Sequence, residues 1–303
     1  MADVELDLER LRDLRLREPG AVAAKALSRR RRPLVGDDGR VMLVAADHPA
    51  RNALGVRGEA MAMGDRGELL ARLVTALRRP GVDGVLGTPD VLEDLLLLGE
   101  LDDRVAIASM NRGGLQGSVF ELDDRFTACD AATVERMRWD GGKMLTRIGL
   151  DDPATAATLE ASARAVSGLA ERRLVAMVEP FVSRRVDGRL QNDLSTEGVV
   201  RSVGVASALG VTSAWTWLKL PVVEGMEQVL AATTLPTLLL GGDPDVDPEL
   251  TYDAWERALA LPGVRGLVVG RALLYPPDGD VAAAVDRAAG MVRGVTVSAG
   301  SRS

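Results

Sequence analysis

Short apolar runs alternate with helix-like segments along most of this chain, and this alternation restricts its fold more than any other feature. Each run holds four to seven residues, in the pattern of a strand that is buried on both faces. The runs predict eight strands, at residues 41–46, 84–87, 105–109, 142–148, 174–178, 214–220, 237–240 and 266–269. The segments after them predict helices at residues 65–79, 90–98, 131–138, 152–171, 193–209, 224–232, 248–260 and 280–291.

Buried strands that alternate with helices form a parallel sheet with helices on its outer face. Eight such units in about 250 residues predict an α/β protein with a closed (β/α)8 barrel, the TIM-barrel fold. A doubly wound sheet is the alternative, but no G-x-G-x-x-G pattern follows the first strand. We expect the barrel at residues 41–293, an N-terminal helical extension at residues 1–40 and a flexible tail at residues 294–303.

Three segments outside the repeat carry further expectations. Residues 1–34 predict a single amphipathic, charged helix, which ends in the arginine run at residues 29–32. We expect this run to be a solvated helix end or a subunit contact rather than a nucleic-acid site. The connection at residues 111–127 is long and rich in glycine, as is typical of a lid over a barrel mouth.

Charge and composition restrict which cellular compartment and which binding partners can be expected. The chain has 37 Lys and Arg against 44 Asp and Glu, a formal net charge of -7, which disfavours nucleic acid and anionic membranes as partners. The N-terminus lacks the apolar core of a secretory signal, and no apolar stretch approaches the ~20 residues of a membrane helix. We therefore expect a cytoplasmic protein that acts on a small molecule and forms a homo-oligomer.

Three scarce residue types restrict the chemistry. The single histidine, His48, and the single cysteine, Cys129, exclude an internal disulfide and leave a zinc site dependent on carboxylate ligands. We expect Cys129 to be a packing residue, and we expect no metal and no cofactor. The chain has only three lysines, Lys25, Lys143 and Lys219, and the last two lie inside predicted strands.

An unpaired ammonium group is costly in a strand that is packed on both faces, so Lys143 and Lys219 need an explanation. The structural explanation is that each lysine pairs with a buried carboxylate such as Asp47 or Glu179. The chemical explanation is that a desolvated lysine loses its proton and becomes a nucleophile, which arginine cannot do. Clusters of perturbed charges favour a functional site, so we favour Schiff-base chemistry with a carbonyl substrate.

The C-terminal ends of the strands carry the active site in a TIM barrel, and the candidate residues lie there. We predict four catalytic residues, Lys219, Lys143, Glu179 and Asp47. The candidates for substrate or phosphate binding are Gly241, Gly242, Gly270, Arg271, Arg147, His48 and Arg112. The glycines follow the last two strands, the usual phosphate locus of such barrels, although glycine also simply ends strands. A satisfied structural imidazole is an equal alternative for the histidine.

These motifs resemble the class I, Schiff-base aldolases of the deoxyribose-phosphate, tagatose-bisphosphate and fructose-bisphosphate aldolase superfamily. The likeness is carried by Asp47-His48, GGKMLTRI at 141–148, VEPF at 178–181, WLKLP at 217–221, GG at 241–242 and VVGR at 268–271. It looks closest to the tagatose-bisphosphate aldolase branch. The resemblance implies that Lys219 is the Schiff-base nucleophile and Lys143 the auxiliary lysine. It also implies that Glu179 is the proton shuttle and Asp47 the hydroxyl-binding acid–base residue.

The resemblance implies a lyase of carbohydrate metabolism that cleaves or forms a carbon–carbon bond in a phosphorylated keto sugar or related keto acid. Dihydroxyacetone phosphate would be one product. Two alternatives stay open. A transaldolase-like transfer, or an aldolase for a deoxy-keto acid or a sulfonated sugar phosphate, keeps the lysine chemistry. A barrel that only binds a metabolite does not use this lysine chemistry, and its lysines would have ordinary basicity.

Overall fold

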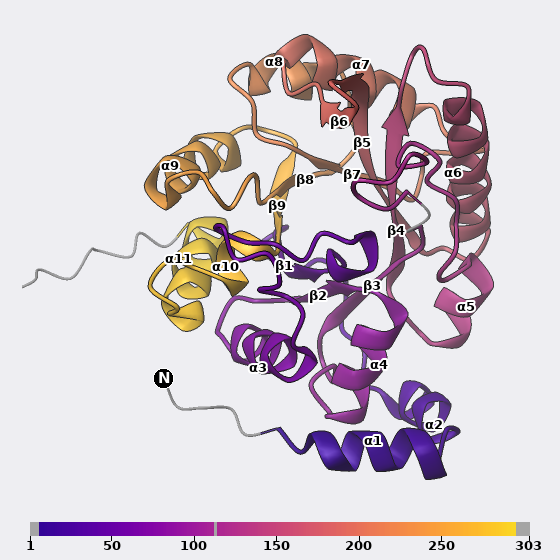
Figure 1. Cartoon of the computed structure of the whole chain (residues 1–303), viewed down its shortest axis with the longest axis vertical. Helices are drawn as coiled ribbons and strands as arrows, with labels where there is room; N and C mark the ends of the chain where they lie inside the picture. Colours follow the sequence, from indigo (N-terminus) through magenta and orange to yellow (C-terminus); the bar gives the residue numbers. More distant parts are fainter. Residues whose placement is uncertain (1–5, 112–113, 295–303) are drawn as a thin grey trace, which may run out of the picture.

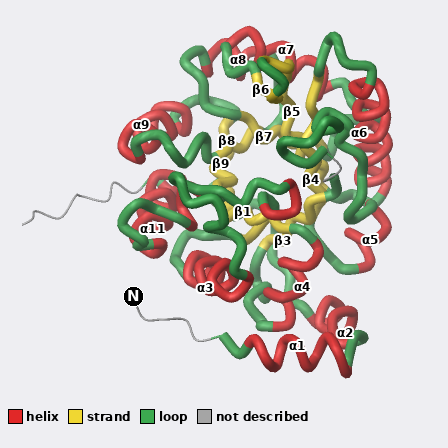
Figure 2. The backbone as a smooth tube through the Cα atoms, in the orientation of Figure 1, coloured by secondary structure: helices red, strands yellow, loops and turns green. Residues whose placement is uncertain are grey.

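A closed barrel of parallel strands forms the centre of the protein (Figures 1 and 2). The computed structural model describes residues 6–111 and 114–294. The barrel strands are β1 Val41–Ala46, β2 Gly84–Gly87, β3 Val105–Ser109, β4 Gly141–Ile148, β5 Val175–Val186, β7 Thr216–Leu220, β8 Thr237–Leu240 and β9 Val264–Val269. They pair in parallel in this order, and the pairing of β1 with β9 closes the ring. The predicted (β/α)8 barrel is confirmed.

Helices surround the barrel on its outer face (Figure 2). They are α3 Arg66–Leu77, α4 Pro89–Leu97, α5 Ala131–Arg136, α6 Ala154–Glu171, α7 Thr196–Ser207, α8 Met226–Ala231, α9 Pro248–Leu259, α10 Arg271–Leu274 and α11 Val281–Arg293. A single-turn 3-10 helix, η1, spans Pro49–Arg51. Aspartate caps the N-termini of α3, α5 and α11. The side chains of Asp65, Asp130 and Asp280 each accept a hydrogen bond from a backbone N–H in the first turn of their helix.

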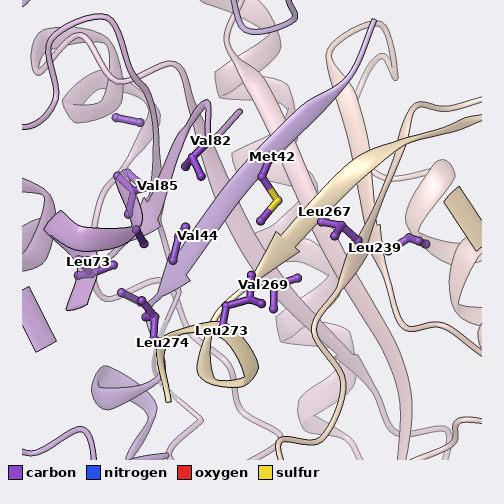
Figure 3. Packing of buried hydrophobic residues seen from close by; sticks show 14 of the residues in the cluster. Met42, Val44, Leu73, Val82, Val85, Leu239, Leu267, Val269, Leu273 and Leu274 are labelled. Atoms are coloured by element: carbon purple, nitrogen blue, oxygen red, sulfur yellow. The ribbon is translucent and has the colours of Figure 1, made fainter. Parts of the chain in front are cut away.

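The barrel strands are mostly apolar because both of their faces are covered. On β1, Met42 and Val44 belong to the layer between the barrel and its helices, where they pack in one cluster with Leu73 (Figure 3). The alternate residues Val41 and Leu43 belong to a second cluster inside the barrel. Successive side chains of a strand point to opposite faces, so a strand between two apolar layers has no polar side.

The N-terminal extension consists of two helices, α1 Leu8–Arg17 and α2 Ala21–Ser28, so the prediction of one helix is wrong. Proline lacks a backbone N–H and glycine is a poor helix former, and Pro19-Gly20 lies at the break. Figure 1 shows the pair outside the ring of helices, beside α4. None of the helices in residues 6–111 and 114–294 combines the length and apolar composition needed to cross a membrane.

The arginine run after α2 binds acidic residues at the N-terminal ends of the strands. Arg29 is 2% exposed and lies 3.3 Å from Asp140, which precedes β4. Arg32 lies 2.7 Å from Asp83, which precedes β2. Each carboxylate also accepts a hydrogen bond from a backbone N–H of a neighbouring strand. The donor–acceptor distance is 2.8 Å for Asp140 and 2.7 Å for Asp83. The expected solvated helix end is therefore wrong for Arg29 and Arg32, whereas Arg30 and Arg31 are exposed. The alternative of a subunit contact stays a prediction.

Strand β5 continues beyond the barrel and returns as β6 Arg189–Asn192 in an antiparallel hairpin. The predicted strand ended at residue 178, so this hairpin was missed. Its turn, Asp187-Gly188, has positive φ angles of 50° and 76°. Asp-Gly is typical of a two-residue hairpin turn of this kind, and this dipeptide was the signal available in the sequence.

Candidate active site

Four side chains at the C-terminal end of the barrel form one buried charged cluster. Lys143, Glu179 and Lys219 project from the neighbouring strands β4, β5 and β7, and Asp47 directly follows β1. None of the four is more than 8% exposed. The structure therefore brings together all four residues that the sequence predicted to be catalytic.

Glu179 contacts both lysines at once. Its Oε1 lies 3.0 Å from Nζ of Lys219, and its Oε2 forms a close ion pair with Nζ of Lys143. The same Nζ of Lys143 donates a hydrogen bond of 2.9 Å to Oδ2 of Asp47. The two lysines and two carboxylates form a continuous chain with balanced charge, as burial of ionised groups requires.

Burial and the attraction between the lysines and the carboxylates shift the pKa values of this cluster in opposite directions. Burial, opposed by Glu179 and assisted by the ammonium group of Lys143, lowers the pKa of Lys219 below its ordinary value of 10.5. Burial alone would raise the pKa of Glu179, but the two lysines outweigh it and lower this pKa to about 2. In the same way they hold the pKa of Asp47 well below its usual range. The carboxylates stay ionised, while Lys219 loses its proton more readily than an exposed lysine.

Ser109, the last residue of β3, is part of the same cluster and was missed in the sequence. Its hydroxyl donates a hydrogen bond of 3.2 Å to Oδ2 of Asp47, the oxygen that also accepts from Lys143. Ser109 is buried. Its place at the C-terminal end of a barrel strand was the available signal.

A cavity of about 1410 Å³ opens above the cluster. It is lined by ten of the eleven predicted site residues: Asp47, Lys143, Glu179, Lys219, His48, Arg147, Gly241, Gly242, Gly270 and Arg271. The eleventh, Arg112, lies outside the described residues. One cavity thus joins the lysine cluster to the predicted phosphate locus.

The glycines after β8 and β9 are places of close approach. A Cβ atom at Gly241 would lie 2.7 Å from a methyl carbon of Val269, and one at Gly270 would lie 2.5 Å from the carbonyl oxygen of Ala45. Arg271 follows Gly270 and donates a hydrogen bond of 3.2 Å to the carbonyl oxygen of Gly55. Within residues 6–111 and 114–294 no carboxylate lies within ion-pair distance of this guanidinium, but Asp243 and Asp245 are close enough to oppose the lowering of its pKa by burial.

Arg147 lies on the cavity wall, but its hydrogen bonds all go to the connection after β3. It donates a hydrogen bond of 2.8 Å to the carbonyl oxygen of Glu121, and its guanidinium lies 3.3 Å from the carboxylate of Asp124. Arg51 pairs with the same carboxylate at 3.1 Å. Asp124 is fully buried, so the two arginines hold the end of this connection against the barrel, whereas Val119 and Phe120 in its middle are exposed. A lid at residues 111–127 stays a prediction. A substrate-binding role for Arg147 stays a prediction.

Several further segments line the cavity and were not predicted as site residues, among them the loop after β8 with Asp243 and Asp245. The β5–β6 hairpin contributes Arg189, Leu190 and Asn192, and the loop after η1 contributes residues 53–61. In the described part of the chain, no three histidine, cysteine or carboxylate side chains gather as a metal-binding group.

Residues 39–289 match the protein family described as Cgl0159-like. A crystal structure of Cgl0159 from Corynebacterium glutamicum is 53% identical to this chain, with a TM-score of 0.94, and the match covers 96% of this chain and 99% of that one. None of the curated proteins compared matches the chain in sequence.

More distant matches share the fold. An archaeal fructose 1,6-bisphosphate aldolase is 17% identical, with a TM-score of 0.66 over 90% of this chain and 99% of that one. Another archaeal structure, with its catalytic lysine bound to the carbinolamine intermediate, is 18% identical with a TM-score of 0.65, over 90% of this chain and all (100%) of that one. These likenesses show the barrel fold. They do not show that the chain belongs to the tagatose-bisphosphate aldolase branch. The family match and the 53% identical structure show that the chain belongs to the Cgl0159-like family.

Proposed function

We propose that this protein is a class I aldolase that uses Lys219 as its Schiff-base nucleophile. The observation that carries the proposal is the bridge that Glu179 makes between Lys219 and Lys143 in a buried cluster. This arrangement provides a lysine of lowered pKa, a second ammonium group beside it and a carboxylate that reaches both. A structural ion pair needs one lysine and one carboxylate, whereas amine catalysis needs a proton carrier beside the amine.

The first half of the reaction forms the iminium ion. The neutral amine of Lys219 adds to the substrate carbonyl carbon, and the carbonyl oxygen takes a proton from the ammonium group of Lys143. Glu179 then accepts a proton from the Lys219 nitrogen and returns one to the new hydroxyl group, which leaves as water. Because Glu179 contacts both nitrogens, it carries these protons without moving out of the cluster.

The second half breaks the carbon–carbon bond. Asp47 accepts the proton of the substrate hydroxyl, the bond cleaves to release an aldehyde, and its electron pair moves into the iminium to form an enamine. The proton held by Asp47 then passes to the enamine carbon. Addition of water to the resulting iminium releases the ketone product, frees the neutral amine of Lys219 and returns the remaining proton to Lys143. Ser109 and Lys143 hold the accepting oxygen of Asp47 in place.

The substrate we propose is a phosphorylated keto sugar or a related keto acid, with dihydroxyacetone phosphate as the ketone product. The support is the cavity that contains the lysine cluster together with Gly241, Gly242, Gly270 and the guanidinium of Arg271. Glycines permit the close approach of backbone N–H groups to phosphate, and arginine adds a charge-assisted hydrogen bond. The cytoplasmic location, the homo-oligomer and the domain boundaries stay predictions from the sequence.

Borohydride trapping tests the proposal. Dihydroxyacetone phosphate and borohydride should leave a reduced, stable adduct on Lys219, located by mass spectrometry of peptides. Lys219→Met should abolish the adduct, whereas Lys25→Met, at an exposed position on α2, should not change its yield. An adduct yield that is unchanged in Lys219→Met would contradict the assignment.

Turnover assays then separate the alternatives. An aldolase should release an aldehyde from a keto sugar phosphate, and the rate with different acceptor aldehydes distinguishes cleavage from transaldolase-like transfer. A barrel that only binds a metabolite should bind dihydroxyacetone phosphate without forming any adduct.

A further inference from the structure

His48 occupies the part of the cavity between the lysine cluster and the end of β9. It directly follows Asp47, and its ring packs with one edge against Gly270. A Cβ atom at position 270 would lie 2.6 Å from Cε1 and 3.2 Å from Nδ1 of the ring. A side chain at position 270 would collide with the imidazole as well as with the carbonyl oxygen of Ala45, so the ring packs directly against the backbone of Gly270.

The two ring nitrogens of His48 have different surroundings. Among the described residues neither nitrogen has a hydrogen-bond partner, and only Nδ1 is buried. A buried donor without a partner is rarer than an unpartnered acceptor, so the proton is expected on Nε2. Since the side chain lines the cavity, Nε2 is left as an N–H donor that a ligand can reach.

The charge of His48 follows from its neighbours. Burial lowers the pKa of the imidazole to about 3, with Asp47 opposing the shift and Arg271, Lys219 and Lys143 adding to it. The ring is thus neutral at physiological pH and donates a hydrogen bond without carrying a charge of its own.

We propose that His48 is a phosphate-binding residue that donates its Nε2–H to the phosphate of the ketone substrate as a neutral group. The inference rests on the proposed function, because Lys219 would hold the carbonyl carbon on one side of His48. On the other side lie Gly270 and Arg271, where the phosphate would bind. Phosphate would then be bound by one charged and one neutral donor, and the neutral one does not titrate between about pH 5 and 8.

Glycerol 3-phosphate is a suitable probe because it has the phosphate arm but no carbonyl, and so cannot form an imine. The amide nitrogen of glutamine lies near the position of imidazole Nε2, and that of asparagine lies near Nδ1. In calorimetric titrations we expect His48→Asn to bind glycerol 3-phosphate about tenfold more weakly than the wild type, because one hydrogen bond to a charged group is lost. We expect His48→Gln to keep most of the affinity.

Several results would overturn the inference. The first is that the wild type does not bind glycerol 3-phosphate. The second is that His48→Asn and His48→Gln lose the same affinity while their thermal unfolding is unchanged. The third is that His48→Asn keeps full affinity. A cationic histidine would strengthen wild-type binding as the pH falls through about 6.5, relative to His48→Gln, and this too would contradict the neutral donor. Failure of the proposed function has a different signature, because binding of glycerol 3-phosphate would persist while borohydride trapping at Lys219 fails.

Discussion

Oε1 of Glu179 lies 3.0 Å from Nζ of Lys219, and the other oxygen of the same carboxylate holds Lys143. Strand order explains the bridge: β5 lies between β4 and β7, so an inward-facing residue on β5 lies between inward-facing residues of its two neighbours. The central carboxylate therefore contacts both amines and opposes the lowering of the Lys219 pKa by burial.

Replacing this carboxylate by an amide tests its role as proton carrier. Glu179→Gln keeps the size of the side chain but cannot carry a proton, so we expect the turnover number for aldol cleavage to fall about 100-fold or more. Glycerol 3-phosphate binding, measured on the same sample, reports whether the cavity is intact. A variant with normal turnover would exclude Glu179 as the proton carrier.

The rate of adduct formation should depend on pH through Lys219. Only the neutral amine reacts, so trapping with dihydroxyacetone phosphate should become faster as the pH rises and level off above the pKa of Lys219. Because this pKa is lowered, the midpoint should lie below 10.5. The measurement is the rate of mass increase at Lys219 across a pH series, and a midpoint at or above 10.5 would contradict the lowered pKa.

Lys143 should contribute to this lowered midpoint through its charge. Lys143→Met removes a neighbouring ammonium group, so the pKa of Lys219 should rise. The trapping rate at neutral pH should then fall, by about tenfold if the midpoint moves up by about one pH unit. Lys143→Arg retains the positive charge and is the matched control. The same midpoint in all three proteins would show that Lys143 does not act on Lys219 through its charge.

Asp47 should act after the iminium has formed. Asp47→Asn removes the base that accepts the substrate hydroxyl proton, so cleavage should slow about 100-fold while the borohydride adduct at Lys219 still forms. Comparing adduct yield with aldehyde release separates the two steps. Parallel loss of both would place Asp47 in imine formation instead.

At the other end of the barrel, Arg29 should matter for stability rather than activity. Among the described residues, Arg29→Ala leaves the buried carboxylate of Asp140 with Arg31 alone as a charged partner, and breaking a buried pair costs about 3 kcal/mol. Arg30→Ala is the matched control, because Arg30 is exposed and solvent-exposed ion pairs add little to stability. Urea unfolding of the two variants measures the difference. Equal effects would mean that the Arg29 pair adds no more than a surface pair.

Much of the barrel was predictable because strand burial leaves a direct trace in the sequence. Strands β1, β2, β3 and β8 have the predicted bounds, since apolar runs end where the chain leaves the barrel. The β5–β6 hairpin was not predicted, because its residues are half-exposed and lack an apolar run. The break between α1 and α2 was missed although Pro19 and Gly20 stand at it.

The sequence by itself determined the fold and the identity of the four charged residues, because a lysine inside an apolar strand is costly and therefore stands out. Only the tertiary structure decided which carboxylate meets which lysine, since this depends on the order of strands around the ring. It also decided that Arg147 binds the connection after β3 and that Gly270 makes room for His48. Such contacts join residues far apart in the chain, and their distances are set by the closure of the barrel, which no local pattern records.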